Sequence, residues 1–459
     1  MRTLRFAAVA AVAACVLFAL SCHKNEEYSQ HFNKASDEHF KRDMSDMSSF
    51  KLKNGITVYL QEERTDNEVA MSAVYRAGYI TDPKGKVQLA HLTEHMLMHC
   101  ASGPYKAGET MSIIQDHNGK ISAEALADFI HVDYVVDASK LDEALTIEAS
   151  RMTSLIGDEQ NLKKDQKDVV DEINNSLKDE KGNLSRLSLS ALAHVIYYGE
   201  THVPLEAGVA RLTVADVQQF HDTHYRPDDM IIVMIGNFKK ADAEAMVRKH
   251  FESVPSRPGL PDPTFVIKHS VKATWDVPAQ TEFFIAPGPF DPKESLILTM
   301  FGAFVSQLLQ NSPDVYQNVQ GAYVSNQSYP VGRLPFFIFL QAREGFTTEK
   351  AVPALFARLD QSVKALDDDK RVELIKTGMI SIITSSGLKA DEPDFPMMHY
   401  QVIGQEALSV CVKHILLNGR TADEFAADVQ AITPEEFRAV VKKRLDRSKL
   451  LTVTFEPRS

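Results

Sequence analysis

The feature that most constrains the fold of this chain is an internal repeat with an offset of 220 residues. Thr213 aligns with Thr433, and in both copies an acidic residue follows three positions later. This spacing is the signature of a capped helix start. An apolar strand then follows at the same distance, at residues 231–235 and 451–455. Identical spacing of a helix start and a strand predicts a tandem duplication, so the chain should fold as two similar units.

A proline-rich segment separates the two copies. Residues 255–263 contain four prolines, which neither a helix nor a central strand accommodates. We therefore expect one domain over residues 49–254, a linker over 255–263 and a homologous second domain over 264–459.

The pattern of elements predicts an α+β fold. Asn54-Gly55 lies between two alternating runs, which is a strong hairpin signal. Further along we expect strands near 121–136 and helices near 88–99 and 161–181. Because hairpins alternate with helices, each domain should be a mixed or antiparallel sheet covered by helices.

The N-terminus is typical of an export signal. Arg2 and Arg5 precede an apolar run over residues 6–20, which is short for a membrane span. The run ends at Ser21-Cys22, as in bacterial lipoprotein signals, in which this cysteine is lipidated. Ala19 stands where such signals usually carry Leu, so secretion without lipid and a retained membrane anchor stay open as alternatives.

We therefore expect residues 1–22 to be a lipoprotein-type signal and the polar residues 23–48 to be a tether. This places the protein in a bacterial cell envelope, as a periplasmic or outer-membrane lipoprotein, with secretion as the alternative. Any membrane contact would be made through the N-terminal lipid alone.

Composition excludes one class of partner and one source of stability. The chain has 50 Lys and Arg against 62 Asp and Glu and no basic run, so nucleic acid is not an expected partner. Beyond the signal only Cys100 and Cys411 remain. They could form one disulfide, although two half-buried thiols are the commoner arrangement. A hydrophobic core must therefore hold the fold together.

The strongest chemical signal is His91-Leu-Thr-Glu94-His95, in a run compatible with a helix. On a helix the two histidines lie one turn apart on one face, and Glu94 lies beside them. This H-x-x-E-H arrangement can bind one metal ion next to a carboxylate base. A catalytic zinc also needs a third protein ligand and an open position.

A candidate for the third ligand is Glu172, which follows His95 by 77 residues. Asp165, Asp168 and Glu172 share one stripe of the expected helix. For an isolated helix, the commoner explanation of such a stripe is a solvated acidic face.

The sequence around these residues resembles the pitrilysin/insulinase/mitochondrial-processing-peptidase family of zinc peptidases. Residues 87–97 resemble the active-site helix of that family. There, a zinc-binding Glu follows the second His at about this distance, with another acid seven residues earlier. Glu172 and Asp165 match these two positions, although the earlier acid is more often Glu. Residues 77–85 and 225–236 extend the resemblance, which covers essentially residues 50–459 because the family also consists of duplicated α+β domains.

The resemblance implies a zinc-dependent endopeptidase that hydrolyses peptides or unfolded polypeptides. It implies three zinc ligands: His91, His95 and Glu172. Glu94 would be the general base for a zinc-activated water, and Asp165 would fix the orientation of a ligand. The corresponding helix of the second domain, residues 296–309, contains no His or Glu, so we expect one Zn²⁺ per chain.

Two departures from the family concern the substrate. The edge strand of the family carries Asn-Ala, where this chain has Ser122-Ala123. The family often has an Arg and a Tyr seven residues apart that hold the substrate and the oxyanion. Tyr323 matches the Tyr, but Tyr316 stands at the Arg position. Tyr323 could equally be an ordinary strand aromatic.

These departures leave rival functions open. Related peptidases enclose substrate between two halves, and this chain supplies one, so we expect a homodimer or a heterodimer with a related two-domain subunit. The main alternative is a non-catalytic or partner-dependent scaffold subunit. A purely structural metal site is a further alternative, which Glu94 disfavours because a closed site needs no spare base.

Overall fold

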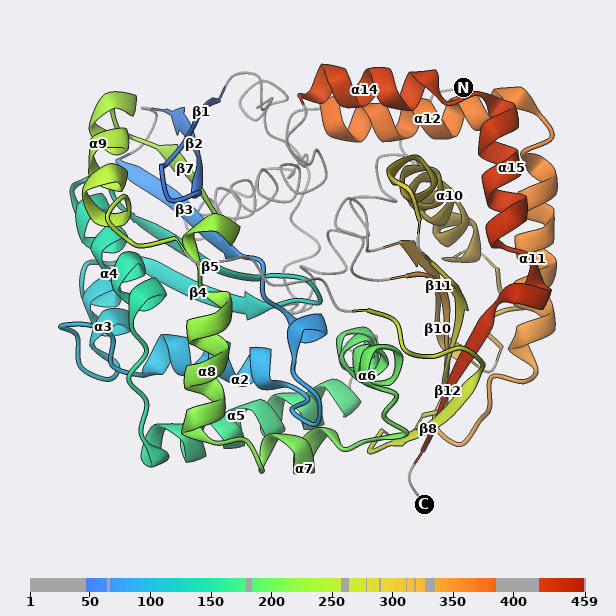
Figure 1. Ribbon diagram of the computed structural model, residues 1–459, viewed down its shortest axis with the longest axis horizontal. Coiled ribbons are helices and arrows are strands. Elements are labelled where there is room, and N and C mark those ends of the chain that lie inside the picture. The colour runs from blue at the N-terminus through green and yellow to red at the C-terminus, as the bar shows by residue number, and fades with distance from the viewer. Residues whose placement is uncertain are drawn as a thin grey trace.

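The computed structural model (Figure 1) describes the chain in ten segments: residues 47–63, 67–178, 184–256, 264–277, 279–288, 290–310, 312–317, 319–326, 335–384 and 421–457. The expected export signal, Cys22 and nearly all of the tether lie outside the described residues, as does Cys411. Within the described residues, no helix combines the length and the apolar character needed to cross a bilayer.

The first sheet has six strands in the order β1-β2-β7-β3-β5-β4. Its strands are β1 (Ser48–Lys51), β2 (Thr57–Glu62), β3 (Glu68–Tyr75), β4 (Lys120–Ala125), β5 (Ile130–Asp137) and β7 (Met230–Gly236). Only β2 and β7 run parallel; the other neighbours are antiparallel. The predicted hairpin at Asn54-Gly55 joins β1 to β2, and Gly55 has a φ of 112° that favours glycine.

The second sheet repeats this plan in the order β10-β11-β9-β12-β8-β6. Its strands are β6 (His202–Val203), β8 (Val271–Trp275), β9 (Thr281–Ala286), β10 (Val319–Asn326), β11 (Phe336–Ala342) and β12 (Leu451–Pro457). Five strands of each sheet correspond, β2-β7-β3-β5-β4 with β8-β12-β9-β11-β10. The parallel pair, β12 with β8, lies at the matching place. The fold is therefore two copies of one α+β unit, as the repeat predicts.

One strand departs from the division at the proline-rich segment. β6 precedes that segment in sequence, yet it pairs in parallel with β8 of the second sheet. The chain thus reaches the second sheet before residues 255–263, and the domain boundaries stay a sequence-based expectation.

Helices cover the sheets and lie between them (Figure 1). With the first sheet come α2 (Leu89–His99), α3 (Glu109–Asp116), α4 (Leu141–Thr153), α5 (Glu159–Lys178), α6 (Leu184–Tyr198), α7 (Leu205–Val209), α8 (Val214–His224) and α9 (Lys240–Phe251). With the second come α10 (Pro292–Gln310), α11 (Ala351–Ala365), α12 (Asp369–Thr384), α14 (Ala422–Ala431) and α15 (Pro434–Arg444).

The central strands β9 and β11 of the second sheet are buried on both faces, which explains their apolar runs. Side chains alternate across a strand. Along β9, Phe283 and Ile285 join a core shared with the first sheet and its helices, whereas Phe284 and Ala286 join a second core beneath α10, α11, α12, α14 and α15. The shared core packs the two units against each other, so burial of apolar surface joins the halves.

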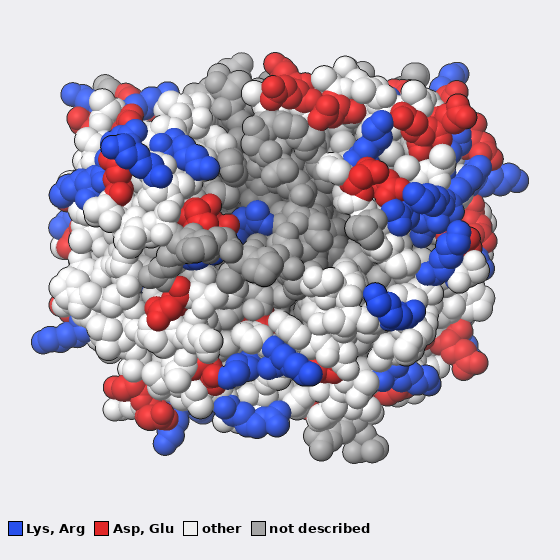
Figure 2. Space-filling view, in the orientation of Figure 1, with Lys and Arg blue, Asp and Glu red and all other residues white. Residues whose placement is uncertain are grey.

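Charged side chains of both signs are interspersed over the described surface in Figure 2. Several pair between neighbouring elements, as Lys442 does with Asp367 at 3.2 Å and Lys249 with Asp142 at 2.9 Å. Exposed pairs of this kind contribute little to stability, about 0–1 kcal/mol each.

Candidate metal centre

An aspartate sets the start of α2 and thereby the place of its histidines. The Asp82 carboxylate accepts the backbone N–H of Gln88 at 2.8 Å and of Ala90 at 2.7 Å. Burial raises the pKa of Asp82 well above its usual value, although these backbone hydrogen bonds oppose the rise. A carboxylate that accepts the free N–H groups of the first turn stabilises the helix start. His91 therefore lies in a well-anchored first turn.

The three expected zinc ligands meet between α2 and α5. The Nε2 atom of His91 lies 3.2 Å from Oε2 of Glu172, and Nε2 of His95 lies 3.5 Å from Oε1 of the same carboxylate. The side chains of His91 and His95 are 12% and 11% exposed, whereas Glu172 is 56% exposed. The cluster is thus closed on the histidine side and open to solvent at Glu172.

The chemistry of this donor set fits a zinc ion. The amide oxygen of Gln88 lies 3.0 Å from Nδ1 of His91. An oxygen there accepts the ring N–H, which leaves the lone pair on Nε2, the nitrogen that faces Glu172. Two imidazoles and one carboxylate are the ligand set of many catalytic zinc sites.

Electrostatics in the cluster favour a cation. Burial lowers the pKa of His95, but the hydrogen bond to Glu172 and the charges of Glu94 and Glu172 outweigh it and raise that pKa to about 9. Burial raises the pKa of Glu172, yet the hydrogen bonds to His91 and His95 hold it below its usual value. Carboxylates that stabilise an imidazolium this strongly would also stabilise a bound divalent cation.

Glu94 lies next to this donor set and is buried. Its residue exposure is 7%, and ligand atoms of His91, Glu94 and His95 all lie within 4.8 Å of one another. Burial raises the pKa of Glu94, although the neighbouring charges of His95 and His91 oppose the rise. A carboxylate with a raised pKa is suited to take up a proton and release it again near neutral pH.

Asp165 lies on the same seam but contacts a residue that sequence reasoning overlooked. Its Oδ1 atom is 2.7 Å from Nδ1 of His99, whose ring lies edge-on to His95 with centroids 6.3 Å apart. Sequence reasoning also missed Gln88 and the role of Asp82. The spacing of His99, four residues after His95, was the available signal.

The expected substrate residues lie on the edge strands of the two sheets. Ser122 and Ala123 are on β4, which packs beside α2, and Ser122 is exposed. Tyr323 is on β10, and its ring packs on Phe339 and Phe337 with centroids 4.7 and 5.9 Å apart. Their roles stay predictions.

Tyr316, at the expected Arg position, is engaged within the second unit. Its hydroxyl donates a hydrogen bond to the backbone oxygen of Ala322 at 3.0 Å. Burial raises the pKa of Tyr316, so the phenol stays neutral. This side chain supplies no positive charge of the kind that the family's Arg provides.

Comparison with known proteins confirms the resemblance to the pitrilysin/insulinase family of zinc peptidases. Residues 211–379 match the family described as the peptidase M16 inactive domain. The matched stretch begins downstream of Glu172. It therefore covers the end of the first unit and much of the second, and it does not include the candidate metal ligands.

Individual relatives point the same way. The chain is 26% identical over 213 residues to the zinc protease PqqE of Helicobacter pylori, covering 45% of this chain and 47% of that protein. The chain thus aligns with about half the length of this curated relative.

Solved structures show the same fold. A protease from Helicobacter pylori superposes with a TM-score of 0.64 at 16% identity, covering 91% of this chain and all of that one. The periplasmic protease PqqL from Escherichia coli superposes with a TM-score of 0.52 at 12% identity, and this chain covers 48% of it.

Proposed function

We propose that this relative of the M16 peptidases is a zinc-dependent endopeptidase that cleaves peptides or unfolded polypeptides. The observation that carries the proposal is the meeting of His91 and His95 from α2 with Glu172 from α5, with buried Glu94 beside them. A scaffold protein has no use for a buried base next to three zinc-type ligands.

In this mechanism His91, His95 and Glu172 would hold one Zn²⁺. When bound, the ion would lower the pKa of a water molecule towards ~7 and polarise the scissile carbonyl. Glu94 would take the proton of that water on its carboxylate and later deliver it to the leaving amine. Gln88 keeps the Nδ1 proton of His91 in place, and Asp165 holds His99 against the His95 ring.

The extended substrate would lie along β4. Among the described strands, β4 pairs with β5 and ends the sheet next to α2. A peptide can add to a strand at the edge of a sheet as a further strand. Ser122 and Ala123 would contact the substrate there, and Tyr323 would approach the oxyanion from the second unit.

Metal analysis combined with peptide cleavage tests this proposal. The wild type should carry about one zinc and cleave unfolded peptides. Glu94→Gln should keep the zinc and lose cleavage by ~10²–10⁴-fold. His95→Ala should lose both, and the exposed His117→Ala should change neither. Equal zinc content in the wild type and His95→Ala would refute the assignment.

A second candidate is a subunit that is active only with a partner. Two observations favour it: residues 211–379 match the inactive domain, and Tyr316 is turned onto Ala322. A missing oxyanion donor typically costs 10²–10³ in rate, and a related two-domain partner could restore it. Zinc-loaded chain that turns over peptide only after a homologous subunit is added would support this candidate. Full activity in a monomer, with mass measured in solution, would refute it.

We also propose that the protein is exported to the cell envelope and anchored through Cys22. The support is the signal-like N-terminus and a structural relative described as periplasmic. The mature protein should partition into detergent, and Cys22→Ser should release it or block processing. Unchanged detergent partitioning of a cleaved Cys22→Ser variant would contradict lipidation.

A further inference from the structure

Two groups of side chains that could bind a metal ion lie along the contact between α2 and α5. We call this contact the seam and the two groups the outer rung and the inner rung. The outer rung is the site proposed above. The inner rung is a second group, His95, His99 and Asp165, whose ligand atoms also lie within 4.8 Å of one another. Among the described residues, these two rungs hold both of the clusters that could bind a metal ion.

The two rungs follow from the helix repeat. His91, His95 and His99 are spaced four residues apart, so each lies about one turn further along one face of α2. Asp165 and Glu172 are seven residues apart, about two turns on α5. Glu172 contacts His91 and His95, whereas Asp165 contacts His99, so the two helices run in opposite directions along the seam.

Asp165 provides an independent observation that points to a ligand. Its side chain is fully buried, and Oδ1 contacts His99, but Oδ2 has no hydrogen-bond partner among the described residues. A buried carboxylate oxygen without a partner is costly. A cation held between Asp165, His99 and His95 would satisfy it. The His99 side chain is 28% exposed, which gives an ion access from solvent.

We propose that His95, His99 and Asp165 form a second binding position for a divalent transition metal, which competes with the outer site for His95. A neutral imidazole offers a single nitrogen lone pair, so His95 can serve one metal ion at a time. The inner group contains neither Glu94 nor Glu172, so an ion there would be stored without a base beside it. The inference rests on the proposed function only for the identity of the outer site.

Cobalt(II) binding to the purified full chain tests the inner position. Cobalt substitutes for zinc with similar ligands, and its absorption reports coordination without any need for activity. His91→Ala disables the outer rung and should still bind cobalt, about 10- to 1000-fold more weakly than the wild type. Adding His99→Ala or Asp165→Asn to it should weaken binding by at least a further 10-fold. The double variant His91→Ala/His117→Ala, which removes an unrelated histidine, should bind like His91→Ala.

A second variant of the outer rung controls for the possibility that His91→Ala misfolds. Glu172→Gln should also retain weak binding that His99→Ala removes, with circular dichroism confirming the fold of each variant. Equal binding in His91→Ala and His91→Ala/His99→Ala would overturn the inner position, as would no binding by folded His91→Ala and Glu172→Gln. The proposed function fails differently, by the absence of peptide cleavage in the zinc-loaded wild type.

Discussion

The two halves of the molecule place the same pair of helices on the same kind of sheet but use the seam between them differently. In the first half, α2 and α5 bring three histidines into contact with carboxylates, from buried Asp165 to solvent-exposed Glu172. In the second half, α10 and α12 also contact each other, and their residues Leu296, Met300 and Val372 are buried in one apolar core. The contact between the two helices thus holds ionisable side chains in the first half and apolar core residues in the second half.

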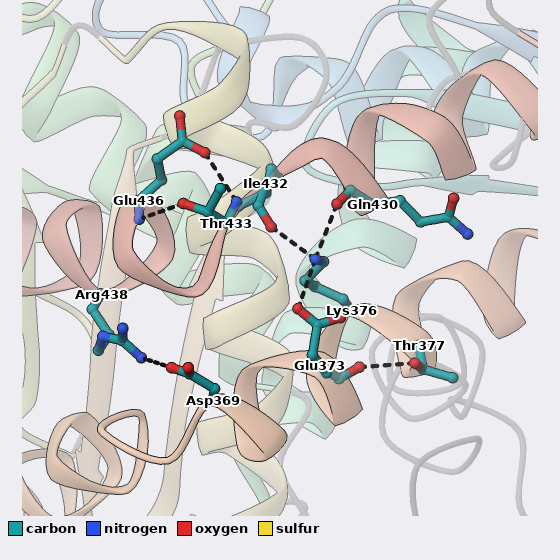
Figure 3. Close-up of polar contacts among 9 residues, drawn as sticks. All are labelled: Asp369, Glu373, Lys376, Thr377, Gln430, Ile432, Thr433, Glu436 and Arg438. Atoms are coloured by element: carbon teal, nitrogen blue, oxygen red, sulfur yellow. Dashed lines mark hydrogen bonds and ion pairs between the residues drawn. The ribbon is translucent and has the colours of Figure 1, made fainter.

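One buried charge of the second half, Lys376, serves the fold. Lys376 of α12 is 4% exposed and donates to the backbone oxygens of Gln430 at 3.1 Å and Ile432 at 2.7 Å, and to Glu373 at 2.9 Å (Figure 3). Those backbone oxygens lie at the C-terminal end of α14, where a cation is favourable. Here a buried charge is fully paired, whereas Asp165 keeps an unpartnered oxygen. The buried carboxylate of the first half thus keeps an oxygen that a ligand could satisfy, whereas the ammonium of Lys376 does not need one.

The largest expected effect comes from making the first seam resemble the second. His95→Leu should lower kcat/KM by at least ~10³-fold because it removes the shared metal ligand. The metal-free protein should be unchanged or stabilised by up to about 2 kcal/mol, since apolar packing replaces a buried charged group. Peptide turnover and urea unfolding of the metal-free protein measure the two effects. Undiminished turnover would show that the two seams do not differ in function.

The second largest effect is expected from removing the buried charge of Lys376. Lys376→Met keeps the length of the side chain but removes its donors, so it should lower the free energy of unfolding by about 2–3 kcal/mol. Zinc content should not change. The control is Lys442→Met, which breaks an exposed pair with Asp367 and should cost less than about 0.5 kcal/mol. Equal costs for the two variants would remove the structural role of Lys376.

A third effect is expected from a buried histidine that the first sheet has on β5 and the second sheet lacks at the corresponding strand, β11. β11 is buried and mostly apolar along its length, whereas β5 carries His131, whose ring nitrogens lie 2.7 Å from Asp133 and 3.4 Å from Glu124. Burial lowers the pKa of His131, but these two carboxylates outweigh it and raise that pKa to about 10. The folded pKa exceeds the unfolded value of ~6.5. The stabilisation is therefore complete below pH ~6.5 and is lost as the pH rises through about 10.

His131→Gln should therefore be about 1.5–2 kcal/mol less stable than the wild type at pH 6, and the gap should close towards pH 10. Urea unfolding at several pH values measures it. A gap that stays constant or widens with rising pH would contradict the assigned charge.

The smallest effect should be equal in the two halves. Thr213 and Thr433 each form a capping box, with Asp216 and Glu436 respectively. Thr→Ala at either position should cost about 1 kcal/mol, and Thr→Ser should restore most of it. Thermal unfolding compares the four variants. A difference of more than about 1 kcal/mol between the Ala variants would show that the duplicated starts have diverged in energy as well as in sequence.

Local spacing was sufficient to predict much of this protein. The repeat at Thr213 and Thr433 predicted two similar units, and the helix expected near 161–181 is α5, Glu159–Lys178. The spacing of His91, Glu94 and His95 placed them on one helical face. These features depend on helix and strand periods, which act within a few residues and are therefore legible in sequence.

Only the tertiary structure decided how distant segments meet. A stripe of acids on α5 does not reveal which acid faces which histidine. Packing set the register that placed Glu172 at His91 and His95 and placed Asp165 at His99. Packing likewise brought β6 into the second sheet from before the proline-rich segment. The positions of these partners depend on how whole elements bury their apolar faces, which the spacing within any one element does not contain.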